Sequence, residues 1–144
     1  MLLLLIHAAA TWFLVGLIWV IQLVHYPLMI HVTQGFGAFH EAHSMRITWI
    51  VGPLMCTELV TAFLLTQGGL GIPAWAAWLG LGLVGVCWLA TLLLAIPQHA
   101  VLAKGMDPIA LARLVGTNWL RTLAWSARGV LVLWMLHAAT AATS

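Results

Sequence analysis

Four of the seven histidines in this chain fall close together, in and beside a short connector between two strongly apolar segments. They are His25, His31, His40 and His43. Imidazole is the commonest metal ligand in proteins, and its unperturbed charge change falls near neutral pH. Histidines at this density beside a membrane-length segment therefore point to a metal site.

Three of these histidines, with His99 from later in the chain, form the candidate ligand set. His40 and His43 are three residues apart, so a helix would present both rings on one side. His25 ends an apolar stripe, and His99 follows Pro97 at the end of another apolar segment. Three or four imidazoles suit iron, copper or zinc, and the two cysteines are too few for an iron–sulfur cluster. We therefore predict a transition-metal site formed by His25, His40, His43 and His99.

Two other interpretations of the histidines stay open. They can act as simple amphipathic anchors at a lipid–water interface, and His31, in the connector, is expected to be solvated. Alternatively, His25 and His99 can ligate a haem iron while Arg46 or Arg121 meets the propionates. Periodicity in the sequence does not separate a haem from a non-haem metal site.

The elements that must position these residues follow from the composition, which is 64% hydrophobic and only 6% charged. Soluble domains carry about 25% charged residues. About 20 apolar residues suffice for a helix to cross a hydrocarbon core of about 30 Å. Four segments meet this length: 2–26, 47–66, 74–96 and 119–140. The sequence therefore predicts an all-α, integral-membrane four-helix bundle in one domain (1–144), solvated by the lipid bilayer. No basic patch with interleaved aromatic residues exists, so nucleic acid is not an expected partner.

The connectors give further expectations about the helix ends. Tyr26-Pro27 is expected to end the first helix, because the residue before a proline disfavours helical geometry. Asp107 is expected to cap a helix with Pro108 at its first position. We predict a short interfacial helix over 108–115, ended by Gly116, before the fourth helix.

The few charged residues also predict the orientation in the membrane. Arg46 lies in the first connector, and Lys104 and Arg113 lie in or beside the third. By the positive-inside rule, both connectors are cytoplasmic and the N and C termini lie on the non-cytoplasmic side. The histidine site is then on the cytoplasmic side.

Three charged residues fall within the apolar segments, and we predict that two of them pair. Arg121 and Arg128 lie on the inward side of the fourth helix, where an isolated charge costs at least about 2.5–3.5 kcal/mol. Glu58 and Arg128 both lie roughly 15–17 Å from the cytoplasmic helix ends at 1.5 Å per residue. We expect a buried Glu58–Arg128 ion pair, direct or through water. The pair either fixes helix register only, or takes part in chemistry, so Glu58, Arg121 and Arg128 are the candidate catalytic residues.

Short motifs add a family resemblance. They are Gln22-x-x-His25-Tyr26-Pro27-Leu28, Phe36-x-x-Phe39-His40-x-x-His43-x-x-Arg46 and Asn118-Trp119-x-Arg121-Thr122. With them the chain resembles small bacterial four-helix membrane proteins and, more distantly, the anthrone-oxygenase-like family. The resemblance implies a bacterial inner-membrane protein that oxidises a lipophilic substrate.

The leading functional hypothesis is an integral-membrane, metal-dependent oxidoreductase whose lipophilic substrate enters from the bilayer. Arg46 or Arg121 would orient a polar or anionic substrate end, and Glu58 would supply a proton route. One alternative is a non-catalytic haem- or pigment-binding subunit of an electron-transfer or light-harvesting complex. Another is a small transporter or assembly factor. A chain of this size is expected to form a homo-oligomer or to join a larger membrane complex.

Overall fold

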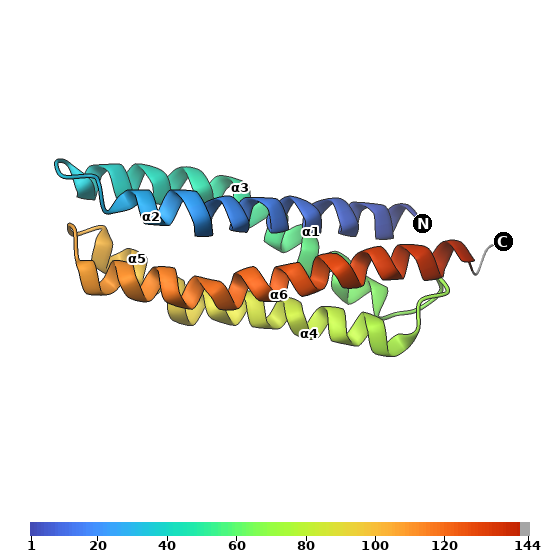
Figure 1. Ribbon diagram of the computed structural model, residues 1–144. Coiled ribbons are helices and arrows are strands. Elements are labelled where there is room, and N and C mark those ends of the chain that lie inside the picture. Colours follow the sequence, from blue (N-terminus) through green and yellow to red (C-terminus); the bar gives the residue numbers. More distant parts are fainter. Residues whose placement is uncertain (142–144) are drawn as a thin grey trace.

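A computed structural model describes residues 1–141, in which all regular structure is helical. The helices join into four long stretches that run along one another (Figure 1). In chain order they are α1 (Leu2–Val20) with η1 (Ile21–His25) and α2 (Tyr26–Met29); α3 (Phe36–Leu65); α4 (Ala74–Ala90) with η2 (Thr91–Ala95) and α5 (Ile96–Leu102); and α6 (Pro108–Ala141). The predicted all-α, four-helix architecture is confirmed.

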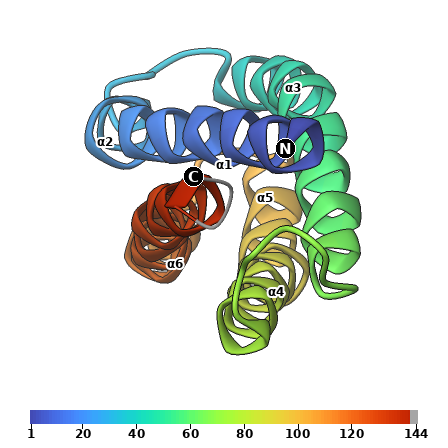
Figure 2. The ribbon, with the colours of Figure 1, turned by 90° about the vertical axis from the view of Figure 1, so that its right-hand side faces the viewer.

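The end-on view shows how the four stretches are arranged (Figure 2). α1 packs against α3 and α6, and α4 packs against the same two helices. Half of the most apolar part of the first stretch is buried, against 22% for α3 and 28% for the α4–α5 stretch. The first stretch is therefore the most buried of these three, and α3 and the α4–α5 stretch leave more of their surface exposed.

Pro27, which is expected to end a helix, and Pro97 both lie inside continuous helical stretches. η1 and η2 are π-helical turns, and each comes directly before a dipeptide ending in proline, Pro27 or Pro97. Proline lacks an N–H and its ring collides with the carbonyl group four residues earlier. A π turn widens the helix locally and accommodates this loss. The prediction that Tyr26-Pro27 ends the first helix is therefore wrong, and the helix runs to Met29.

The predicted interfacial helix over 108–115 is also wrong as a separate element. Asp107 does cap a helix, because its Oδ1 accepts two backbone N–H hydrogen bonds of 2.9 Å. That helix is α6 itself, which passes through Gly116 without a break. Gly116 is not among the glycines with positive φ, the conformation that ends a helix at glycine. Leu111 and Leu114 are buried in the bundle core instead of lying on a membrane surface.

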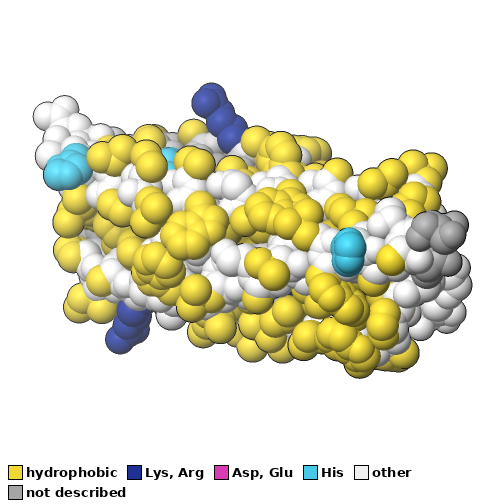
Figure 3. All heavy atoms as spheres, turned by 45° about the vertical axis from the view of Figure 1, so that its right-hand side comes forward, with side chains coloured by type: hydrophobic (Ala, Val, Ile, Leu, Met, Phe, Trp, Pro, Cys, Tyr) yellow, Lys and Arg dark blue, Asp and Glu magenta, His cyan; other side chains and the backbone are white. Residues whose placement is uncertain are grey.

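Three of the four stretches of the described chain are long and apolar enough to cross a membrane: Leu2–Met29, Phe36–Leu65 and Ala74–Leu102. On the face drawn in Figure 3, hydrophobic side chains are spread along the bundle, and the basic side chains in view protrude at its edges, as expected for contact with lipid. α6 is more polar and contains Arg113, Arg121 and Arg128. These features suggest a membrane protein.

α1 begins and α6 ends at the same end of the bundle, opposite α2 and α5 (Figure 1).

Candidate functional site

The four histidines named as candidate ligands come together at the end of the bundle far from the termini. Nε2 of His40 lies 2.9 Å from Nδ1 of His99, and their ring centroids are 5.1 Å apart. The ring centroids of His25 and His43 are 4.0 Å apart. The prediction that helix topology brings these side chains to one end is confirmed. Their role as metal ligands stays a prediction.

Two glycines at the start of α3 allow the close approach of His40 to His99. Gly35, which precedes α3, has φ of +64°, a conformation that side chains rarely adopt. A Cβ atom at Gly37 would lie 3.3 Å from the carbonyl oxygen of Ala103, just after α5. The absence of a side chain at residue 37 therefore lets the first turn of α3 pack against the end of α5.

Two imidazole nitrogens of the cluster are buried without a hydrogen-bond partner among residues 1–141. They are Nε2 of His25 and Nδ1 of His40. Buried polar atoms are nearly always hydrogen-bonded, so these two atoms are available to a ligand or metal. Their burial without a partner is the clearest sign of a binding site at this end.

The fit of the cluster to a metal ion is partial. Two nitrogens that bind one metal at about 2.0–2.1 Å, at angles of about 90–109°, lie about 2.9–3.4 Å apart. The His40–His99 separation of 2.9 Å meets this requirement, and without a metal the two nitrogens form a hydrogen bond at the same distance. In the described part of the chain, however, no group of three or more ligand side chains is already arranged around one point. The half-buried rings of His25 and His43 would have to rotate to complete the coordination.

A cavity of about 220 Å³ lies beside the histidines, between α3 and the α4–α5 stretch. Most of its wall is apolar, and His43 and His99 line its histidine end. Leu92 and Ile96 also line it and are 48% and 50% exposed. The cavity therefore opens on the apolar side surface of the bundle.

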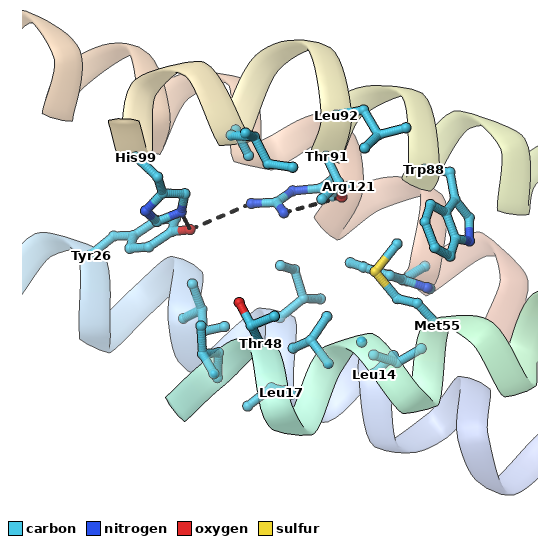
Figure 4. Close-up of a pocket in the computed structure, with 18 of the residues that line it drawn as sticks. Leu14, Leu17, Tyr26, Thr48, Met55, Trp88, Thr91, Leu92, His99 and Arg121 are labelled. Atoms are coloured by element: carbon cyan, nitrogen blue, oxygen red, sulfur yellow. Dashed lines mark hydrogen bonds between the residues drawn. The ribbon is translucent and has the colours of Figure 1, made fainter. Parts of the chain in front are cut away.

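Among residues 1–141, Arg121 is the only arginine, lysine, aspartate or glutamate that lines this cavity, and it is only 8% exposed. It lies between Tyr26 and His99 on one side and Met55 and Trp88 on the other (Figure 4). Its guanidinium donates hydrogen bonds to Tyr26 Oη at 3.5 Å and to Thr91 Oγ1 at 3.3 Å. The tyrosine oxygen lies 3.3 Å from Nε2 of His99. A chain of polar contacts thus joins Arg121 to the histidine cluster.

A pair of buried amides fixes the other side of Arg121. Nδ2 of Asn118 donates to Oε1 of Gln22 at 2.6 Å, and Oδ1 of Asn118 accepts from the guanidinium. Gln22 lies in η1, one turn before Tyr26. The sequence prediction missed Tyr26 and Thr91 as partners of Arg121. The available signal was that the only tyrosine in the chain lies four residues after Gln22.

Arg46, the other predicted cofactor-binding arginine, lies on a different cavity. This second cavity, of about 300 Å³, is lined by Arg46, His25, His43 and neighbouring apolar residues. Arg46 is exposed. Arg46 and Arg121 therefore do not share a cavity, although His43 lines both.

A second polar network lies deeper in the bundle and contains the predicted ion pair. Nε of Arg128 lies 2.9 Å from Oε1 of Glu58, and the two side chains are 0% and 1% exposed. Oε1 of Glu58 also accepts from Thr11 at 2.9 Å, and Oε2 accepts from Trp125 Nε1 at 3.0 Å. The prediction of a direct Glu58–Arg128 pair is confirmed.

The other two nitrogens of Arg128 also have partners. They meet the carbonyl oxygen of Gly80 and, at 3.1 Å, Nε2 of His7. Neither of the two cavities is lined by Glu58 or Arg128. The catalytic role predicted for this pair stays a prediction.

Comparison with known proteins gives no relative from which to carry over a function. No protein family matches the chain, and no curated protein or solved structure is significantly similar to it. The resemblance to the anthrone-oxygenase-like family stays a hypothesis. The function has to be argued from the site itself.

Proposed function

We propose that this chain is an integral-membrane, metal-dependent oxidoreductase that acts on a lipophilic substrate. In this proposal His25, His40, His43 and His99 bind a transition metal next to the cavity between α3 and the α4–α5 stretch. The observation that carries it is the His40–His99 nitrogen separation of 2.9 Å, with two more imidazoles in ring contact beside it. The buried, unpartnered Nε2 of His25 supports the same site, whereas the unpartnered Nδ1 of His40 faces away from the nitrogen that meets His99.

Iron or copper would supply the redox chemistry, whereas zinc would bind the same imidazoles without electron transfer. The reaction we favour is a two-electron oxidation with dioxygen as acceptor. The substrate loses two electrons and two protons, and dioxygen takes up both to become hydrogen peroxide. The apolar cavity wall would exclude water, while Tyr26 and Arg121 would hold the polar end of the substrate.

Location and assembly belong to the same proposal. The basic residues of the first and third connectors favour a site on the cytoplasmic side of a bacterial inner membrane, with both termini on the other side. The poorly buried sides of α3 and α4 leave room for a homo-oligomer or for neighbouring subunits in a larger membrane complex.

The two other function classes have less support. A haem ligated by His25 and His99 needs room for its ring beside each imidazole, and in the structure His25 instead contacts His43 and His99 contacts His40. A transporter gated by Glu58 and Arg128 would need a path to that pair, and neither cavity is lined by them.

Metal analysis of the purified protein tests the proposal. The wild-type protein, equilibrated with iron, copper or zinc and then desalted, should retain about one metal ion per chain. His40→Ala combined with His99→Ala should lose it, and His31→Ala, at an exposed connector residue, should retain it. Helical circular dichroism shows that each variant is folded.

Two results would overturn the proposal. One is a folded wild-type protein that retains no metal, and the other is a double variant that retains as much as the wild type. An intense Soret band in the optical spectrum of the same sample would instead establish the haem alternative.

A further inference from the structure

We propose that the cavity between α3 and the α4–α5 stretch binds a single-chain lipophilic carboxylate, and that Arg121 holds the carboxylate group. This inference rests on the proposed function, because it names the chemical class of its substrate. It depends on the cavity and on Arg121, and the metal is not needed for binding. Charge, geometry and cavity size support it in turn.

The charge argument starts from the chain's only three acidic residues, Glu41, Glu58 and Asp107. Glu58 is paired with Arg128, Asp107 caps α6, and Glu41 is exposed. Within residues 1–141 no carboxylate lies within ion-pair distance of Arg121, whose recorded partners are all neutral. A buried charge without a counter-charge is unfavourable. A bound anion would supply the missing negative charge.

The geometry leaves one side of the guanidinium available. Asn118 holds Arg121 from within α6, away from the cavity. The hydrogen bonds to Thr91 and Tyr26 are 3.3 and 3.5 Å long, at the weak end of the range. A carboxylate matches the planar fork of a guanidinium with two shorter bonds. Small rotations of Thr91 and Tyr26 would therefore free two N–H donors of Arg121 for a ligand.

The size of the cavity indicates how much of the ligand it holds. Pockets that enclose a drug-sized molecule measure about 300–1,000 Å³. The cavity of about 220 Å³ is smaller, and it opens beside Leu92 and Ile96 on the apolar surface. It therefore fits a headgroup with the first part of one hydrocarbon chain, while the rest of the chain lies in the bilayer. A long-chain fatty acid has this form.

Binding of radiolabelled palmitate tests the inference. The full chain is placed in phosphatidylcholine nanodiscs at pH 8, with empty nanodiscs as background, and hexadecanol serves as the uncharged ligand of equal chain length. The wild-type protein should bind palmitate at least tenfold more tightly than hexadecanol. Arg121→Gln should abolish this preference, and Arg121→Lys should keep part of it. Arg113→Gln, which removes an exposed arginine of the same helix, should leave it unchanged.

Several outcomes overturn the inference. If the wild-type protein binds palmitate and hexadecanol with equal affinity, the carboxylate is not recognised. If Arg121→Gln still prefers palmitate, a residue other than Arg121 recognises the carboxylate. Displacement of palmitate by phosphatidylglycerol at equal concentration would identify a phosphate headgroup in place of the carboxylate. The measurement is made on metal-free and metal-loaded protein. If the protein binds palmitate but retains no metal, this inference stands and the proposed metal site is wrong. If it retains metal but does not bind palmitate, this inference is wrong and the metal site stands.

Discussion

Arg121 and Arg128 lie two turns apart on the same side of α6, and their surroundings differ in one decisive respect. Both are buried, at 8% and 0% exposure. Arg128 meets the carboxylate of Glu58 at 2.9 Å, whereas Arg121 meets only neutral groups. Arg121 lines a cavity, and Arg128 lines neither of the two described.

The difference separates a structural network from a binding network. Around Arg128, hydrogen bonds link Thr11 of α1, Glu58 of α3 and Gly80 of α4 to α6. Both oxygens of Glu58 have partners, so this network is complete without a ligand. The network around Arg121 contains an uncompensated charge and ends at histidines with unpartnered nitrogens. Both networks link the helical stretches, but only the network around Arg121 contains an arginine without an ionic partner among residues 1–141.

The largest expected effect comes from breaking the complete network. Arg128→Gln leaves the Glu58 carboxylate buried without its counter-charge, and losing one member of a buried ion pair costs about 3–5 kcal/mol. We expect the free energy of unfolding to fall by this amount. Unfolding in mixed detergent micelles with increasing sodium dodecyl sulfate, followed by tryptophan fluorescence, measures it.

Arg121→Gln is the matched control for this substitution. It removes a buried charge that has no acidic partner, and this opposes the loss of the hydrogen bond to the buried Oδ1 of Asn118, so the unfolding free energy should fall by less than in Arg128→Gln. Equal losses in the two variants would contradict the distinction between the networks. Exchanging Glu58 and Arg128 should not restore stability, because Trp125 and Thr11 donate to residue 58 and Gly80 accepts from residue 128.

An intermediate effect is expected from removing one hydrogen-bonding group in each network, to which Trp125→Phe adds the packing loss of a smaller ring at a buried site. Trp125→Phe leaves Oε2 of Glu58 without its 3.0 Å donor, and a buried acceptor left unsatisfied costs about 1–3 kcal/mol. Tyr26→Phe removes contacts of 3.3 and 3.5 Å, so its loss should stay below about 1 kcal/mol. The same unfolding assay compares the two variants. A larger loss in Tyr26→Phe would show that the network around Arg121 also stabilises the fold.

The Glu58–Arg128 pair could be predicted from the sequence because it depends on how far each residue lies from the end of its helix. Each helical residue adds about 1.5 Å, so counting residues from the helix ends places Glu58 opposite Arg128. His25, His40 and His99 lie at the same end of the bundle because successive helices run in opposite directions. Both predictions use only helix lengths and order.

The network around Arg121 could not be predicted in the same way. The contacts of Tyr26 and Thr91 with Arg121 depend on two π turns that rotate the helix faces before Pro27 and Pro97. The cavity depends on how closely α3 packs against α4 and α5, which helix periodicity does not contain. Glycine is common at helix ends, so the sequence predicts an end at Gly116, but that role requires a positive φ, which Gly116 does not adopt in the folded chain.

The smallest expected effect concerns Gly116, which lies in the part of α6 that leads to Asn118 and Arg121. A Cβ atom there would meet nothing within 4 Å, and alanine favours an internal helical position over glycine by up to about 1 kcal/mol. Gly116→Ala should therefore raise the unfolding free energy slightly and leave palmitate binding unchanged. Gly129→Ala is the contrast, because its Cβ would lie 3.3 Å from Trp12 and should lower stability. If Gly116→Ala lowers stability instead, α6 is interrupted at that residue, and the placement of Arg121 on the same helical face as Arg128 has to be revised.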